Sequence, residues 1–189
     1  QRPLEVTAVI LAAGRSSRMG APKLLMNVRG VPMIDRVLDA CRDFETIVVS
    51  SPEVAAHIRI RPRMKVIRNH QPDLGMAHSF EIANAAAPPD HAMLIFLADK
   101  PLVTAELANT VVKHAEASGA DVCFPEHEGV GGHPVFFSPH ARTRVEIVTG
   151  DSLQSLRDDP ELVRIPVPVD DEGAYRDVNE PAQLRTMNA

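Results

Sequence analysis

The chain has 189 residues, of which 44% are hydrophobic and 4% aromatic, and its formal net charge is −5 at pH 7. The hydrophobic content excludes a disordered chain, and the acidic balance argues against a nucleic-acid-binding protein, which normally presents a basic face. No apolar run approaches the roughly 20 residues that span a bilayer, and no secretory signal is visible. We therefore expect one domain over residues 1–189, with no nucleic acid and no membrane as partner.

The two cysteines, Cys41 and Cys123, lie far apart and lack the C-x-x-C spacing of a zinc or redox site. Each lies in an apolar stretch, so we expect two reduced, buried thiols. A reducing compartment, the cytoplasm, follows from this expectation.

Predicted strands and helices alternate along most of the chain. Short apolar, β-branched runs predict strands, and apolar residues that recur with helical period predict helices. In chain order, the prediction is a strand at Thr7–Leu11, a helix at Pro32–Arg42, strands at Thr46–Ser50 and Met64–Ile67, a helix at Met76–Ala87, a strand at Met93–Ala98, a helix at Thr104–Ser118, strands at Asp121–Pro125 and Pro134–Ser138, and a helix at Glu180–Met187. Thr104 is the expected N-cap and Gly119 the C-terminal stop of the third helix, and residues 126–132 are the most loop-like stretch.

Strands that alternate with helices imply an α/β fold with right-handed crossovers and an open, mostly parallel sheet. Ligands of such sheets bind beyond the carboxyl ends of the strands. We therefore expect the chemistry after Leu11, after Ala98, and in the loops near Gly75 and Gly132.

The loop after the first strand reads LAAGRSSRMGAPK over Leu11–Lys23. Its small residues let backbone approach a ligand closely, and exposed N–H groups can cradle phosphate oxygens. Arg15, Arg18 and Lys23 add cations that suit the about four negative charges of a nucleoside triphosphate. The P-loop spacing and the G-x-G-x-x-G fingerprint are absent. The alternative is a polar loop whose charges face water.

This loop resembles the L-A-[AG]-G-x-S-x-R-M-G-x-x-K motif of the MobA-like nucleotidyltransferases, with every defined position filled. Further segments resemble the family's motifs in order along essentially the whole chain. They are NHQPDLGMAHS at Asn69–Ser79, LADKP at Leu97–Pro101, GGHPVFFS at Gly131–Ser138, TGDS at Thr149–Ser152 and DVNEPAQL at Asp177–Leu184. The molybdenum cofactor cytidylyltransferases are the most similar subfamily. The resemblance implies a Rossmann-like three-layer α/β/α fold of nucleotide-diphospho-sugar transferase type, and CMP transfer from CTP to molybdopterin with release of pyrophosphate.

Asp99 follows an apolar strand and precedes Pro101, at the expected ligand edge of the sheet. Mg²⁺ usually takes one or two carboxylates together with substrate phosphates. The resemblance implies that Asp99 binds a Mg²⁺ cofactor, with a second oxygen ligand from Asp177 or Asn179. Alternatively, Asp99 caps the helix that begins near Thr104, and the other two are turn residues.

The acceptor of such a reaction is a phosphate monoester, which is already a nucleophile and needs no general base. Positioning and electrostatic stabilisation are therefore the main catalytic tasks. We expect Arg18 and Lys23, the latter as an exposed loop lysine, to stabilise the transition state, which makes these two and Asp99 the catalytic set.

The family's nucleoside-binding positions fall in two loops. They correspond to Leu11, Ala12, Ala13, Gly14 and Arg15 after the first strand, and to Gly75 and Ser79 in the second loop. Ser79 could instead cap the helix that follows. Guanylyl-transferring relatives carry glycine at the position of Ala13, so alanine there favours CTP over GTP, although uridylyl-transferring relatives share it.

His133 in GGHP and Lys100 beside the metal aspartate are the expected acceptor-binding residues, for a phosphorylated pterin whose product a molybdoenzyme would receive. Alternatively, His133 is a structural hydrogen-bonding residue and Lys100 points to solvent. His127 and His133 lack the ligand pattern of a zinc site. Departures from the family pattern at Ala98, Lys100, Glu180 and Gln183 leave other phosphorylated acceptors open, such as methylerythritol phosphate or a sugar phosphate. A non-catalytic cofactor-binding module is a further alternative.

Overall fold

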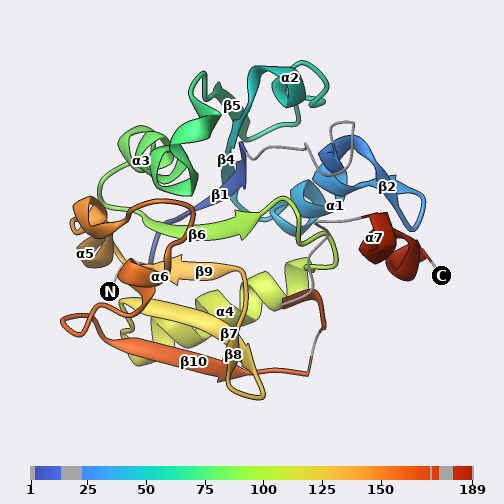
Figure 1. Ribbon diagram of the computed structural model, residues 1–189. Helices are drawn as coiled ribbons and strands as arrows, with labels where there is room; N and C mark the ends of the chain where they lie inside the picture. The colour runs from blue at the N-terminus through green and yellow to red at the C-terminus, as the bar shows by residue number, and fades with distance from the viewer. Residues whose placement is uncertain (1–2, 14–22, 171, 175–180, 189) are drawn as a thin grey trace.

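The computed structural model describes residues 3–13, 23–170, 172–174 and 181–188 (Figure 1). Its main-sheet strands are β1 (Val6–Ala12), β4 (Glu45–Ser50), β5 (Met64–Arg68), β6 (Ala92–Leu97), β7 (Val122–His127), β8 (Val130–Gly131), β9 (Val135–Phe137) and β10 (Arg164–Pro168). Within the described ranges these make one eight-stranded sheet in the order β10–β7–β9–β6–β1–β4–β5, with β8 paired to β7. Two further strands, β2 (Asn27–Val28) and β3 (Val31–Pro32), form a separate hairpin.

Parallel pairing dominates the sheet, as the alternating pattern predicts. Strand β1 lies between β4 and β6 and runs parallel to both. The exception on the main path is β9, which runs antiparallel to β6 and β7. The α-helices are α1 (Met33–Ala40), α2 (Pro52–Ala55), α3 (Met76–Ala86), α4 (Ala105–Ser118), α5 (Pro139–Arg142), α6 (Gln154–Arg157) and α7 (Pro181–Asn188), and the 3₁₀ helices are η2 (Lys23–Leu25), η3 (Pro72–Leu74), η4 (Val145–Ile147) and η5 (Glu172–Ala174).

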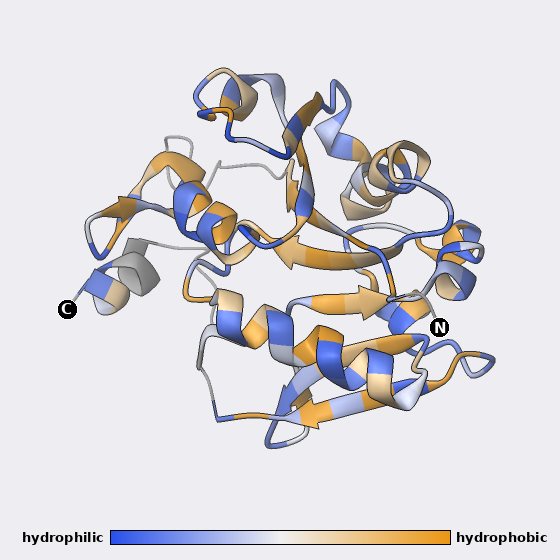
Figure 2. Cartoon of the chain, turned by 180° about the vertical axis from the view of Figure 1, so that it is seen from behind, coloured by the Kyte–Doolittle hydropathy of each residue, from blue (hydrophilic) through white to orange (hydrophobic). Residues whose placement is uncertain are grey.

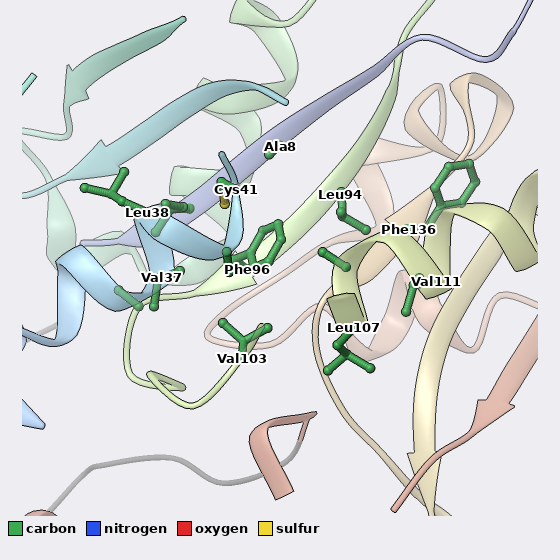
Figure 3. Packing of buried hydrophobic residues seen from close by; sticks show 14 of the residues in the cluster. Ala8, Val37, Leu38, Cys41, Leu94, Phe96, Val103, Leu107, Val111 and Phe136 are labelled. Atoms are coloured by element: carbon green, nitrogen blue, oxygen red, sulfur yellow. The ribbon is translucent and has the colours of Figure 1, made fainter. Parts of the chain in front are cut away.

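Two hydrophobic clusters cover the two faces of the sheet. On one face, α1 and α4 pack against β1 and β6, and Val37, Phe96 and Leu107 belong to one cluster of buried side chains (Figure 3). On the other face lie α3, α5 and α6, and Phe80 packs edge-to-face on Phe137 at a centroid distance of 5.8 Å. Figure 2 shows the strands as predominantly hydrophobic, whereas α4 alternates between hydrophilic and hydrophobic residues. The three-layer α/β/α fold is confirmed.

The predicted boundaries of α4 are confirmed by its caps. The Thr104 side chain accepts a hydrogen bond from the N–H of Leu107 at 3.1 Å, and Gly119 ends the helix with φ of 68°. The expected loop over residues 126–132 is wrong in part, because β7 extends to His127 and turns back through β8. Positive φ values at Glu128 and at the glycine after it make this tight hairpin possible.

The pattern also misses β10, whose sequence RIPVP contains two prolines. Proline cannot donate to a sheet ladder, which argues against a central strand. Among the described strands, β10 is at the edge of the sheet and pairs only with β7, so the missing donors are tolerated.

Cys41 and Cys123 are buried free thiols, as expected. Burial raises the pKa of Cys41 well above its usual range and that of Cys123 to about 11. Among the described residues, no helix is long and apolar enough to cross a membrane.

Candidate active site

A cavity of about 670 Å³ opens at the carboxyl ends of β1 and β6, where the sheet topology predicts a ligand. Its volume is in the range of small-molecule sites. The lining residues come from the ends of both strands, from η2 and η3, from the first turn of α3 with the glycine before it, and from the turn before α6. They are Leu11, Ala12, Ala13, Lys23, Leu24, Pro72, Asp73, Gly75, Met76, Ser79, Leu97, Ala98, Asp99 and Asp151.

Lys23 and Asp99 lie opposite one another in this cavity. The Lys23 Nζ is 3.8 Å from Asp99 Oδ2, and the two side chains are 14% and 26% exposed. The expectation of an exposed loop lysine is therefore wrong. Lys23 opens η2, and the next residue, Leu24, is buried in the hydrophobic core, which holds η2 against the end of the sheet. The structure thus brings a cation and a carboxylate together beside small backbone positions.

Asp99 is not needed as a helix cap, because Thr104 caps α4 with its own side chain. Its carboxylate follows the end of β6 and faces Lys23, and the described part of the chain contains no cluster of three or more His, Cys, Asp or Glu side chains that could hold a metal ion. A single hard oxygen donor in an open cavity fits a divalent cation that takes its remaining ligands from phosphates and water. The predicted partners Asp177 and Asn179 lie outside the described residues, as do Gly14, Arg15 and Arg18.

Ser79 is the fourth residue of α3, whose N-cap position is Gly75, so the alternative that it caps this helix is wrong. It is 2% exposed yet lines the cavity, and its hydroxyl accepts a hydrogen bond of 2.9 Å from the Asn69 amide. Asn69 is itself oriented by accepting from the backbone N–H of Gln71 at 2.8 Å. Because the hydroxyl accepts from Asn69, its own proton remains available for a ligand.

The turn around Asp151 packs against the Gly75 loop, a contact that the sequence reasoning missed. A Cβ at Gly75 would lie 2.5 Å from Asp151 Oδ1 and 2.7 Å from the Gly150 carbonyl oxygen, and Gly75 has φ of 84°. Asp151 Oδ1 accepts from the backbone N–H of Met76 at 3.2 Å, and the Gly150 carbonyl accepts from that of Ala77 at 2.9 Å. Glycine is therefore required at 75 by this packing as well as by its φ.

Asp151 belongs to the TGDS segment. The sequence shows that this segment resembles a family motif, but it predicts no role for Asp151. The available signal in the sequence was a carboxylate directly after a glycine in a segment that resembles a family motif. Asp73, the other acidic lining residue that was missed, lies in the short 3₁₀ helix η3, where the sequence offers no such signal.

His133 and Lys100 are not among the residues that line the cavity. They lie close enough to each other for the charge of Lys100 to affect the His133 imidazole. The ring Nδ1 of His133 is buried and has no hydrogen-bond partner, which does not support the alternative of a structural hydrogen-bonding side chain. Burial, followed by the positive charges of Arg157 and Lys100, lowers the pKa of His133 well below its usual range. The imidazole is therefore neutral at pH 7.

Residues 8–163 match the model of the MobA-like NTP transferase domain. The chain belongs to this family. Among curated proteins, the bifunctional protein GlmU of Alkalilimnicola ehrlichii is 36% identical over 139 residues, which cover 67% of this chain and 29% of GlmU. The chain thus spans less than a third of the length of that relative. Nicotine blue oxidoreductase of Paenarthrobacter nicotinovorans is 26% identical over 95% of this chain and 94% of its own length.

Solved structures of the same architecture cover nearly all of this MobA-like chain. Rv0371c from Mycobacterium tuberculosis H37Rv has a TM-score of 0.82 and 23% identity over 97% of this chain and 98% of its own, and it has also been solved in complex with manganese. Molybdopterin-guanine dinucleotide biosynthesis protein A from Archaeoglobus fulgidus has a TM-score of 0.74 and 18% identity over 96% of both chains. At these identities the likeness establishes the fold.

Proposed function

We propose that this chain is a Mg²⁺-dependent nucleotidyltransferase that transfers CMP from CTP to the phosphate of a pterin, molybdopterin in the cell, and releases pyrophosphate. The observation that carries this proposal is the pair formed by Lys23 and Asp99, 3.8 Å apart in a cavity at the carboxyl ends of the central strands. A nucleoside triphosphate and its metal need a cation, a hard oxygen ligand and closely approaching backbone in one place. Membership of an NTP transferase family supports the same chemistry.

In the proposed reaction, an oxygen of the acceptor phosphate attacks the α-phosphorus of CTP. The bond from the α-phosphorus to the bridging oxygen breaks, and pyrophosphate leaves with the electron pair. Lys23 stabilises the charge that builds on the phosphate oxygens, a role that we also propose for Arg18. Asp99 would hold Mg²⁺, with Asp177 or Asn179, and the bound ion would neutralise the phosphates. The manganese complex of Rv0371c supports a divalent cation in this fold.

In this proposal, residues from two parts of the cavity wall, the end of β1 and α3, select CTP over GTP. Leu11, Ala12, Ala13 and Ser79 line the cavity. In this proposal, the methyl group of Ala13 takes up space that glycine would leave for a purine. Because the Asn69 amide donates to Ser79, the hydroxyl proton can donate to a base carbonyl. Gly14 and Arg15 complete the proposed nucleotide-binding set with Gly75.

The acceptor is proposed to bind beside His133 and Lys100, outside the nucleotide cavity. A neutral imidazole next to an ammonium group suits a phosphate monoester that carries hydrogen-bonding ring atoms. The subfamily resemblance and the similarity to a molybdopterin-guanine dinucleotide biosynthesis protein support a pterin. We propose a molybdoenzyme as the recipient of the product, one domain over residues 1–189, and a cytoplasmic location, which the buried free thiols support.

The test is pyrophosphate release from each of the four NTPs with Mg²⁺, using molybdopterin, methylerythritol phosphate or N-acetylglucosamine 1-phosphate as acceptor. We expect release with CTP and the pterin, and dinucleotide product by mass spectrometry. Turnover with a sugar phosphate instead would preserve nucleotidyl transfer and reject the pterin. No release in any combination would reject the transferase, and a crystal soaked with CTP and Mg²⁺ would then show whether the cavity binds nucleotide at all.

A further inference from the structure

Arg157 is a buried cation to which the proposed reaction assigns no role. It lies in α6, is 6% exposed, and its guanidinium stacks over the Phe124 ring at 4.6 Å from the centroid. Arg164 stacks over the same ring at 4.7 Å and pairs with Asp158 at 3.7 Å. Burial, and then the charge of Arg164, lowers the pKa of Arg157 to about 10, so the guanidinium stays charged at neutral pH.

Arg157 contacts the loop that carries His133. Its Nη2 donates to the Gly132 carbonyl oxygen at 3.4 Å, and a Cβ at Gly131 would lie 2.5 Å from the same nitrogen. The same loop contacts Ala174: the His133 N–H donates to the Ala174 carbonyl at 2.6 Å, and a Cβ at Gly132 would lie 2.1 Å from that oxygen. The absence of a side chain at the two glycines thus lets Arg157 and Ala174 approach the loop closely.

Two buried polar atoms in this cluster make no hydrogen bond. Among the described residues, the buried side-chain nitrogens and oxygens without a partner are Arg157 Nε and His133 Nδ1. Leaving a buried donor or acceptor unpaired costs free energy, because the atom has given up its hydrogen bonds to water. Arg164 already supplies Phe124 with a stacked guanidinium, so packing on the ring alone does not account for a second, buried one. Buried polar groups in native proteins are nearly always hydrogen-bonded, so each of these two atoms needs an explanation, and a functional role is one.

We propose that Arg157 is a positioning residue that fixes the Gly131–His133 loop, so that the His133 imidazole is held beside Lys100 for the acceptor. The proposal rests on the proposed function in placing the acceptor at His133. The alternative is a packing role, in which Arg157 and Arg164 contribute only by stacking on the Phe124 ring. The matched pair of substitutions is therefore Arg157→Met and Arg164→Met, since each removes one guanidinium from the same ring.

The first measurement is native-state amide exchange by NMR, which needs no substrate. The amides of Gly132 and His133, which donate to Pro125 and Ala174, should exchange at least tenfold faster in Arg157→Met, relative to the core amide of Val9, and remain protected in Arg164→Met. The second is steady-state kinetics. With a pterin phosphate monoester, KM should rise at least tenfold in Arg157→Met, and the dissociation constant of CTP should change less than twofold.

Equal protection of both loop amides in the two variants would overturn the proposal. If Arg157→Met does not fold, Arg157→Lys carries the same test, because lysine keeps the charge without the planar group that reaches both Phe124 and Gly132. In the wild type, 6-hydroxymethylpterin phosphate should shift the NMR resonance of the Arg157 Nε–H, and CTP alone should not. The absence of a shift with the pterin phosphate would also overturn the proposal. A wild type that releases no pyrophosphate rejects the proposed function and leaves the exchange result standing.

Discussion

A carboxylate oxygen of Asp151 accepts a hydrogen bond of 3.2 Å from the backbone N–H of Met76, the first residue of α3. The Ser79 hydroxyl of the same helix lines the cavity, so a residue from a distant turn sets the position of one wall of the nucleotide site. A carboxylate at a helix N-terminus also complements the helix dipole.

Asp151→Ala should therefore loosen the Gly75 loop. We expect a loss of about 1 kcal/mol in the free energy of unfolding, which is typical of a lost N-cap, and at least a fivefold weaker CTP affinity. Chemical denaturation and isothermal titration calorimetry measure the two effects. Asp151→Asn keeps an acceptor oxygen and should lie near the wild type; an Asn variant as weak as the Ala variant would assign the effect to charge.

Lys23→Ala should lower kcat by about 10²–10³, by analogy with the loss of a preorganised donor. The fold should remain, because a partly exposed ion pair contributes at most about 1 kcal/mol. The measurement is turnover at saturating CTP and Mg²⁺. Lys113→Ala, an exposed lysine on α4, is the control. Unchanged turnover in Lys23→Ala would remove it from the site.

Asp99→Asn should raise the Mg²⁺ concentration needed for half-maximal activity and lower the activity itself, because an amide is a weaker ligand for a hard cation than a carboxylate. Metal titration of activity measures both, with Asp90→Asn, an exposed position outside the cavity, as the control. Superimposable Mg²⁺ titrations for Asp99→Asn and the wild type would argue against a metal at this position.

Ala13→Gly should relax the preference for CTP toward GTP without reversing it. Ala13 lines the cavity, and removal of its methyl group should make room for a larger base. Ser79 also lines the cavity and remains as a hydrogen-bond partner, and one buried hydrogen bond is worth roughly 1–3 kcal/mol, or about tenfold to a hundredfold. The measurement is a competition between CTP and GTP, scored by the dinucleotide formed. A wild type that already prefers GTP would reject the cytidylyl assignment but not nucleotidyl transfer.

His133 should make the fold less stable in acid. Its pKa in the folded protein lies well below the unfolded value of about 6.5, so the unfolded chain binds the proton more tightly. Stability is then complete above about pH 6.5 and is lost as the pH falls toward the folded pKa. His133→Asn should reduce this loss between pH 6.5 and 5 in thermal unfolding, whereas His57→Asn, at an exposed position, should not. Parallel pH profiles for the wild type and His133→Asn would contradict the prediction.

The sequence by itself determined the α/β architecture, the ligand edge and the first strand's cavity positions, because these depend on local periodicity and on where strands end. The LIFLA run predicts a buried strand, and the residues that follow it must then lie at the carboxyl edge of the sheet. Thr104 and Gly119 were readable for the same reason, since helix caps are set within one turn of chain.

The tertiary structure alone decided which distant segments share a surface. No local pattern places Asp151 on the N-terminus of α3, Asn69 on Ser79, or Arg157 under the Gly132 carbonyl, because these contacts join residues 75, 10 and 25 positions apart. The sequence could not predict the burial of the Lys23 side chain either, because its exposure depends on how Leu24 anchors η2 in the core. Such contacts form only when the packed layers bring their loops to one edge of the sheet.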